Sequence, residues 1–232
     1  MNKVSERGRN MEKERHVLVV FPHPDDEAFG VSGTISMHIH NGTPVTYACL
    51  TLGEMGRNLG NPPFATRESL PGIRREELKR SAKAMGIQDL RMLGFRDKTV
   101  EFESEKLEKM LRELIAELKP SLMITFYPGY SVHPDHEATG KAVVRVVGEL
   151  PADKRPKLHC VAFASNSEKE LGPPDICNDV SSFSEQKLAA IRAHGTQTAL
   201  FYDDMSKRLA ENDPEAIRWL HYERFWSYQW KD

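Results

Sequence analysis

Short, uninterrupted apolar runs recur along this chain, and segments with helical periodicity lie between them. The first run, residues 16–21, is continuous and rich in valine, which is typical of a strand covered on both faces of a parallel sheet. Further strands are predicted at residues 45–52, 90–95, 122–127 and 158–164. Because strand and helix alternate, the sequence predicts an α/β fold whose parallel strands are joined by right-handed crossovers.

Helical segments complete this expectation. Between the strands, helices are predicted at residues 27–40, 73–85, 107–118 and 137–150. The clearest is 107–118, where apolar residues recur at three- and four-residue steps before Pro120 ends the pattern. After the last strand, helices are predicted at residues 185–193, 198–209 and 214–226. We therefore expect a Rossmann-like, mostly parallel sheet that is flanked by helices and followed by a helical C-terminal part.

Length and charge limit the class of protein. A chain of 232 residues suits one α/β domain, which we expect to span residues 15–232. Residues 1–14 are charged and lack the apolar stretch of a secretory signal, so we expect a flexible tail. The 32 basic and 34 acidic residues nearly balance, which argues against a nucleic-acid partner. No apolar segment reaches the roughly 18 residues of a membrane span, so no membrane partner is expected.

The cysteines indicate the compartment. Cys49, Cys160 and Cys177 are far apart and form no C-x-x-C pair, so neither a disulfide scaffold nor a cysteine-rich zinc site is expected. This usage fits a reducing compartment, and we expect a cytoplasmic protein.

Two short motifs rich in histidine and carboxylate follow predicted strands. His23-Pro24-Asp25-Asp26-Glu27 follows the first strand, and His133-Pro134-Asp135-His136 follows the fourth. Because ligands bind at the carboxyl ends of strands in open α/β sheets, both motifs are expected to line one site. Either motif alone could be a polar turn before a helix, with Asp25 or Asp26 as its N-cap. The occurrence of both favours a shared site.

The residue types suit a catalytic metal centre. Catalytic zinc takes three protein ligands from histidine and carboxylate and leaves a further position for water. His23 and Asp26 are three residues apart, so one turn can direct both side chains to one point. Either His133 or His136 can supply the third ligand. The same donors also suit Fe²⁺ or another divalent ion.

Other side chains of the motifs have the chemistry that hydrolysis needs. Asp25 adjoins a ligand and could act as general base toward a water molecule whose pKa the metal lowers. The second-motif histidine that does not bind the metal could stabilise an oxyanion as an imidazolium, and Asp135 could hold its other ring nitrogen. The alternative is a non-catalytic metal- or sugar-binding module, which would not need Asp25 or a second histidine.

At these residues the sequence resembles the LmbE-like or PIG-L family of zinc-dependent N-acetylglucosamine deacetylases. The family pattern is an apolar strand, then Pro/Ala-His-Pro/Ala-Asp-Asp-Glu, and later His-Pro-Asp-His. The likeness covers nearly the whole chain, more loosely in its last quarter. It implies the LmbE-like deacetylase fold, Zn²⁺ held by His23, Asp26 and His136, and a small amino-sugar substrate. It also implies a homo-oligomer, either a trimer or a hexamer.

The resemblance also implies roles for the neighbouring residues. Asp25 corresponds to a general base that later passes its proton to the leaving amine. His133 corresponds to the histidine that stabilises the oxyanion, with Asp135 behind it. Glu27 is expected to support the first motif from outside the metal site. Arg74 matches an arginine that binds sugar hydroxyls, although by itself it could be a solvated charge on a helix.

Within the family, the sequence looks most like the bacillithiol-biosynthesis deacetylases of the second paralogue type, through residues 53–58 and 222–226. This implies hydrolysis of N-acetylglucosaminyl-malate to glucosaminyl-malate and acetate. Arg57 is a candidate to bind the malate, unless it is a solvated loop residue. A deacetylase of another N-acyl sugar, or an amidase of a thiol conjugate, would have the same metal core. The segment His194-Gly195-Thr196-Gln197 matches a C-terminal family element expected near the mouth of the site, although a helix-end turn would also explain it.

Overall fold

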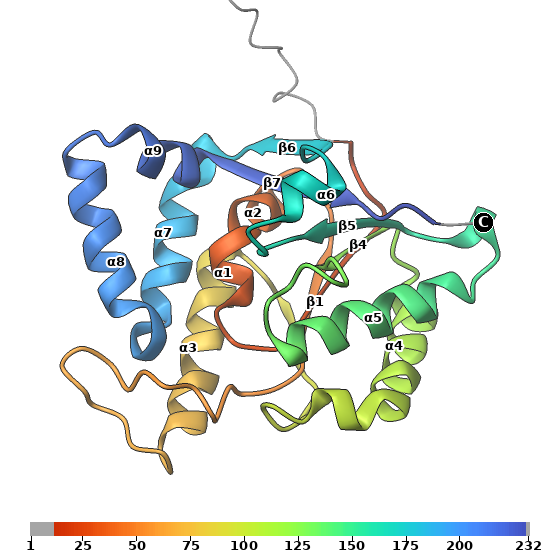
Figure 1. Cartoon of the computed structure of the whole chain (residues 1–232), viewed down its shortest axis with the longest axis horizontal. Helices are drawn as coiled ribbons and strands as arrows, with labels where there is room; N and C mark the ends of the chain where they lie inside the picture. Colours follow the sequence, from red (N-terminus) through yellow and green to blue (C-terminus); the bar gives the residue numbers. More distant parts are fainter. Residues whose placement is uncertain (1–11, 231–232) are drawn as a thin grey trace, which may run out of the picture.

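The computed structural model describes residues 12–230 of the chain. Its seven-stranded sheet has the order β3-β2-β1-β4-β5-β7-β6 (Figure 1). Its strands are β1 (Val17–Phe21), β2 (Val45–Cys49), β3 (Asp89–Met92), β4 (Leu122–Phe126), β5 (Lys157–Val161), β6 (Ile176–Asp179) and β7 (Tyr222–Ser227). The first five pair in parallel, and β7 runs antiparallel between β5 and β6. The expected α/β, mostly parallel sheet is confirmed.

Helices cover both faces of the sheet. They are α1 (Asp26–Gly30), α2 (Ser32–His40), α3 (Leu70–Met85), α4 (Ser104–Leu118), α5 (Pro134–Gly148), α6 (Ser167–Leu171), α7 (Ser184–Ala193), α8 (Gly195–Ala210) and α9 (Pro214–His221). Short 3₁₀ turns span Val100–Glu103, Ala152–Lys154 and Ser181–Phe183. One face is packed by α1, α2, α3 and α7, and the other by α4 and α5 (Figure 1).

The continuous apolar runs are strands buried on both faces. In β1, Val17, Val19 and Phe21 contribute to the core under α1, α2, α3 and α7. Leu18 and Val20 point the other way, into the core under α4 and α5. Because successive side chains of a strand alternate between faces, a strand between two helical layers needs an apolar residue at every position.

The structure divides one predicted helix into two, α1 and α2. The predicted helix 27–40 is interrupted at Val31, whose backbone has φ −142° and ψ 0°. The buried Glu223 carboxylate accepts the backbone N–H groups of Gly33 and Thr34 at 3.0 and 2.7 Å, so a residue of β7 caps the start of α2. The break therefore depends on a contact between distant parts of the chain.

The expectation of a purely helical C-terminal part is wrong in its last segment. The predicted helix 214–226 ends at His221, and β7 follows, while β6 was not predicted at all. In β7, Glu223 and Phe225 are buried whereas Tyr222 and Arg224 are exposed. The alternation over residues 222–225 belongs to a strand with one covered face and not to the end of a helix.

The N-terminal expectation falls partly on the described residues. Of the predicted tail 1–14, residues 1–11 lie outside the described part of the chain. Glu14, by contrast, is buried, accepts a hydrogen bond from Ser121 at 2.6 Å and pairs with Lys157 at 3.0 Å. No helix in the described range 12–230 combines the length and apolar character of a membrane-crossing helix.

The sheet brings the two motifs together. β1 and β4 are parallel neighbours, with Val17 opposite Leu122, so both strands end at the same edge. The chain continues from β1 to β2 on one side and from β4 to β5 on the other, which makes this the point where strand order reverses. A crevice opens at the carboxyl ends of strands at such a point.

Candidate metal centre and active-site cavity

The first motif forms a tight turn between β1 and α1. The backbone N–H of His23 donates to Asp26 Oδ2 at 2.9 Å, so the carboxylate turns back toward the end of β1. Between them, Asp25 has φ 120° and ψ −27°, a conformation that non-glycine residues rarely adopt. The turn therefore directs His23, Asp25 and Asp26 toward one region.

The second motif starts α5. The backbone N–H of Asp135 donates to His133 Nδ1 at 3.1 Å, so the His133 ring acts as the N-cap, and Pro134 occupies the first helical position. The His136 ring lies flat on Phe126, with ring centroids 4.0 Å apart. Its Nδ1 lies 3.0 Å from the carbonyl oxygen of Ser131, which leaves Nε2 directed at the first motif.

The donor atoms of three side chains from the two motifs form a compact triangle. His23 Nδ1 lies 3.2 Å from His136 Nε2, His136 Nε2 lies 3.2 Å from Asp26 Oδ1, and His23 Nδ1 lies 3.5 Å from Asp26 Oδ2. Tetrahedral zinc with bonds of about 2.0–2.2 Å has ligand–ligand separations of about 3.3–3.6 Å. The two imidazoles and one carboxylate therefore fit a metal of this kind.

The far side of His23 is held by carboxylates. Its Nε2 lies 3.2 Å from Asp135 Oδ2 and 3.2 Å from Asp97 Oδ1. Despite burial, which acts the other way, these partners and Asp26 raise the pKa of His23 well above its usual value. A carboxylate on the outer nitrogen of a ligating histidine fixes its ring and its tautomer. His23, Asp97 and Asp135 could themselves hold an ion, as could His23, His133 and His136.

The expected role of Asp135 behind His133 is not what the structure shows. The Asp135 carboxylate is fully buried and accepts the backbone N–H groups of Lys98 at 2.7 Å and Val100 at 3.3 Å, in addition to its contact with His23. Because Asp135 follows the N-cap by two residues, its backbone rather than its carboxylate reaches His133.

The surroundings of His133 disfavour the protonated ring. Burial and the neighbouring His23 and His136 lower the pKa of His133 below its ordinary value. Since Nδ1 accepts a backbone N–H, the proton of the neutral ring is on Nε2. A neutral ring of this kind can donate one hydrogen bond from Nε2.

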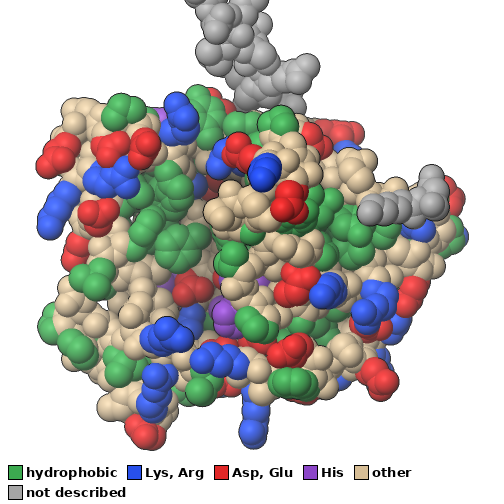
Figure 2. Space-filling view, viewed as in Figure 1, with side chains coloured by type: hydrophobic (Ala, Val, Ile, Leu, Met, Phe, Trp, Pro, Cys, Tyr) green, Lys and Arg blue, Asp and Glu red, His purple; other side chains and the backbone are tan. Residues whose placement is uncertain are grey.

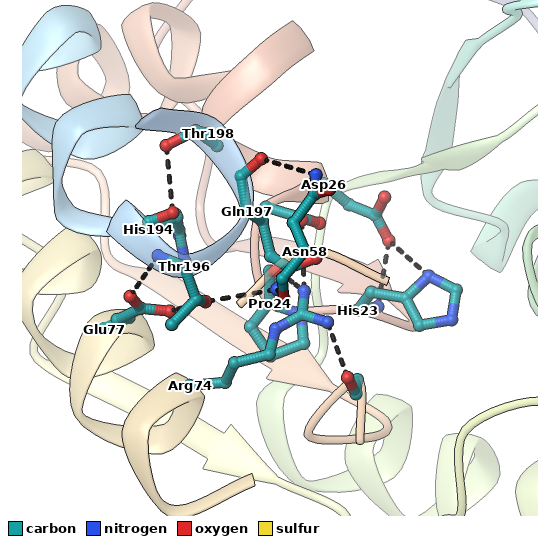
Figure 3. Close-up of polar contacts among 12 residues, drawn as sticks. His23, Pro24, Asp26, Asn58, Arg74, Glu77, His194, Thr196, Gln197 and Thr198 are labelled. Carbon is teal, nitrogen blue, oxygen red and sulfur yellow. Dashed lines mark hydrogen bonds and ion pairs between the residues drawn. The ribbon is translucent and has the colours of Figure 1, made fainter. Parts of the chain in front are cut away.

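Arg74 contacts the first motif directly. Its guanidinium is buried and donates to the carbonyl oxygen of Pro24 (Figure 3). It also donates to the carbonyl oxygen of Gly53 at 2.7 Å and to Asp25 Oδ2 at 3.0 Å. Gly53 has φ +59°, and a Cβ there would lie 1.9 Å from Arg74 Nη1. Burial and the nearby Asp26 raise the pKa of Asp25 to about 6, although Arg74 opposes the shift. Asp26 shows the reverse: burial would raise its pKa, but His136 and His23 hold it far below the usual range.

These side chains line a cavity of about 350 Å³. Its lining comprises His23, Asp25, Asp26, Met55, Gly56, Arg57, Arg74, Asp97, Lys98, His133 and His136. In the space-filling view, histidine side chains reach the surface in a hollow bordered by basic and acidic groups (Figure 2). The structure thus brings every predicted site residue except the fully buried Asp135 to this cavity.

Sequence reasoning missed four lining residues: Met55 and Gly56 in the loop after β2, and Asp97 and Lys98 in the loop after β3. Asp97 also accepts the backbone N–H of Met55 at 2.8 Å, which ties the loop after β2 to the loop after β3. Asp97 and Lys98 come shortly after the third predicted strand, residues 90–95. Because the carboxyl ends of parallel strands share one edge, this position could have indicated that they lie at the site.

Glu27 and His194 lie behind the cavity and not at its mouth. Both are fully buried, and His194 Nε2 lies 2.6 Å from Glu27 Oε1. Burial opposes both shifts, yet the pair lowers the pKa of Glu27 and raises that of His194. His194 links the end of α7 to the start of α8, so it does occupy a helix junction. Of the segment expected near the mouth, His194 lies behind the cavity, whereas Gln197 donates to the carbonyl oxygen of Asn58 in the loop that lines it.

Comparisons with known proteins agree with this geometry. Residues 18–147 match the family model described as PIG-L, GlcNAc-PI de-N-acetylase. The chain is 52% identical over 223 residues to a probable N-acetyl-alpha-D-glucosaminyl L-malate deacetylase 2 of Bacillus anthracis, covering 96% of this chain and 99% of that protein. The protein of the same description from Bacillus subtilis is 48% identical over 220 residues, covering 94% and 100%.

A solved structure is similar over most of its length. The N,N'-diacetylchitobiose deacetylase of Pyrococcus horikoshii superimposes with a TM-score of 0.70 at 25% identity, covering 93% of this chain and 84% of that one. Family model, relatives and fold therefore agree, and the chain belongs to the PIG-L family.

Proposed function

We propose that this protein is a metal-dependent N-deacetylase that hydrolyses N-acetylglucosaminyl-malate to glucosaminyl-malate and acetate, a step of bacillithiol biosynthesis. The observation that carries the proposal is the triangle of His23, Asp26 and His136 beside Asp25 in one cavity. The relatives at 52% and 48% identity, which are described as deacetylases of this compound, support the substrate.

His23, Asp26 and His136 would hold the metal, which we propose to be Zn²⁺. When bound, such an ion supplies Lewis acidity toward the acetyl carbonyl and lowers the pKa of water. Asp25 Oδ accepts a proton as the oxygen of water forms its bond to the acetyl carbon. The same carboxyl then gives that proton to the sugar nitrogen as the C–N bond breaks, which leaves the amine and acetate.

The other cavity residues orient the substrate. The Nε2–H of His133 is the available donor for the carbonyl oxygen as negative charge develops there, and the neutral ring suffices for this role. Asp135 acts on this site through His23, which it holds in place. Arg74 positions Asp25 and can reach sugar hydroxyls, whereas Arg57 is exposed at the cavity and is assigned to the anionic malate.

The test is acetate release from two substrates by zinc-loaded protein. We expect efficient release from N-acetylglucosaminyl-malate, much slower release from free N-acetylglucosamine, and none after removal of the metal by a chelator. Equal rates for both sugars would contradict the malate assignment and leave the deacetylase standing. Undiminished release from fully metal-free protein would contradict the mechanism.

Three broader expectations remain part of the proposal. Residues 15–232 form one domain, the protein is a trimer or hexamer, and it acts in the cytoplasm on a small molecule. Light scattering coupled to size-exclusion chromatography measures the oligomeric state, and a monomer would contradict that part. Fractionation of cells that express the protein tests the compartment.

A further inference from the structure

The backbone of Asp25 is held in a conformation that it would not adopt alone. At φ 120° and ψ −27° a non-glycine residue is in a sparsely populated, strained region of backbone conformation. The strain persists only where surrounding contacts determine the conformation. Two contacts are present: Arg74 bonds the carboxylate, and Glu27 Oε2 accepts the Asp25 backbone N–H at 3.0 Å.

The Glu27 carboxylate is itself fixed from four directions. Oε2 accepts the Asp25 N–H and the Tyr47 hydroxyl at 3.1 Å, while Oε1 accepts the Ser81 hydroxyl at 2.6 Å and bonds His194 Nε2 at 2.6 Å. A carboxylate has about four acceptor positions, so every one is occupied. A fully buried carboxylate with this set of donors cannot turn away from Asp25 without leaving donors unpaired.

His194 is in turn fixed by the helix layer. The backbone N–H of Thr196 donates to Glu77 of α3 at 2.7 Å, and the Thr198 hydroxyl lies 3.0 Å from the His194 carbonyl oxygen (Figure 3). Gln197 donates to the carbonyl oxygen of Asn58 at 2.8 Å, so the same segment also holds the loop that lines the cavity. A rigid helix junction therefore determines where the His194 ring points.

We propose that Glu27 and His194 are a positioning pair for Asp25: His194 fixes the Glu27 carboxylate, and Glu27 fixes the strained Asp25 peptide so that its carboxylate faces the cavity. Neither residue lines the cavity. The inference rests on the proposed function, because it matters to catalysis only if Asp25 is the base.

Substitutions at the two positions separate positioning from mere stability. Glu27→Gln has one acceptor oxygen, so it leaves at least one of the four donors facing an NH₂ group. His194→Leu removes the ring donor, whereas His194→Gln can still present an amide N–H to Glu27. Ser36→Ala is the control: it loses a buried hydroxyl bond to the carbonyl oxygen of Ser32 in α2, at 2.8 Å, without touching Glu27 or His194.

Two readouts are measured for each variant. The first is kcat and KM of the zinc-loaded protein, together with its metal content. The second is hydrogen exchange of the Asp25 amide in metal-free protein, which reports the bond to Glu27 without any reaction. For Glu27→Gln and His194→Leu we expect kcat to fall on the order of 100-fold, as for an ångström-scale misplacement. KM and metal content should be unchanged, and Asp25 exchange should be about tenfold faster.

His194→Gln and Ser36→Ala should keep slow Asp25 exchange and nearly full kcat, even where they unfold at lower urea. Wild-type kcat and slow exchange in Glu27→Gln or His194→Leu would overturn the inference. Loss of metal in proportion to loss of activity would also overturn it, since the pair would then serve Asp26. If wild type hydrolysed no N-acetyl sugar while Asp25 exchange still responded as expected, the proposed function would fail and the positioning of Asp25 would stand.

Discussion

Replacement of Gly53 by alanine should inactivate the site through Arg74. Gly53 has φ +59°, and an added Cβ would meet Arg74 Nη1 at 1.9 Å and Cζ at 2.3 Å, distances that force the guanidinium to move. The buried guanidinium would lose its bonds to the carbonyl oxygens of Gly53 and Pro24 and to Asp25. The side chain that holds the Asp25 carboxylate would then no longer be in place.

The magnitude follows from two contributions. A left-handed alanine destabilises by about 1–2 kcal/mol wherever it occurs. Each lost hydrogen bond to a charged group adds about 1.5–3 kcal/mol. If two of these three bonds are lost, Gly53→Ala should lower the free energy of unfolding by about 4–8 kcal/mol. Misplacement of Asp25 should lower kcat/KM on the order of 100-fold.

Gly42→Ala is the matched control. Gly42 has φ +73°, but its nearest neighbour to an added Cβ is the flexible end of Lys13 at 3.5 Å, an ordinary contact. It lies in the turn between α2 and β2, at the opposite edge of the sheet from the cavity. Gly42→Ala should therefore lose only about 1–2 kcal/mol and keep wild-type kcat/KM. Urea denaturation and acetate release measure both quantities, and equal losses in the two variants would refute the reasoning.

Three further outcomes follow from the structure. Glu223→Gln should lower the free energy of unfolding by about 3–5 kcal/mol, because it leaves the buried Lys187, 3.2 Å away, without its counter-charge. In the same urea titration, the control Glu168→Gln at an exposed ion pair should change the free energy of unfolding by less than about 1 kcal/mol. Burial lowers the pKa of His38 from 6.5 to about 4, so the unfolded chain takes up a proton there that the folded chain does not. Stability should fall by about 1 kcal/mol per unit as pH decreases from 6.5 toward 4, and a His38→Gln variant that shows the same slope would contradict this. Arg57→Met should raise KM for N-acetylglucosaminyl-malate about tenfold and leave KM for free N-acetylglucosamine unchanged, and steady-state kinetics that show equal changes would remove Arg57 from the malate site.

The central part of the fold was predictable because it depends on local patterns. The apolar runs that became β1 and β4 need no partner to be recognised, since a strand buried on both faces is apolar at every position. The spacing of His23 and Asp26, and of His133 and His136, then placed ligand-type side chains at the ends of those strands. The triangle of donor atoms follows from parallel pairing of β1 and β4.

The rest depends on contacts that sequence patterns do not encode. The start of α2 after the break is capped by Glu223, which lies about 190 residues away from its partners Gly33 and Thr34. Asp97 reaches His23 only because β3, β2 and β1 are neighbours in that order. The position of His194 behind the cavity requires the packing of α7 and α8 on the sheet. Each of these is a tertiary effect that overrides a local preference.

The pairing of the two motifs also explains why Asp25 and Asp26 differ. Both are carboxylates of one turn, yet Asp26 faces two histidines and its pKa is lowered, whereas burial raises the pKa of Asp25 to about 6. Groups whose pKa values are driven apart in this way are suited to different tasks. In the proposed mechanism, this difference would separate the metal ligand Asp26 from Asp25, the group that accepts and releases the proton.

The most direct test of this account is the rate of acetate release by Asp25→Asn with its metal content measured in the same sample. Asp25 is not one of the three side chains of the metal triangle, so the variant should bind zinc as the wild type does. Loss of the base should lower kcat by roughly 10²–10⁴-fold at full metal occupancy. A fully loaded variant with wild-type kcat would contradict the role of Asp25, and with it the mechanism.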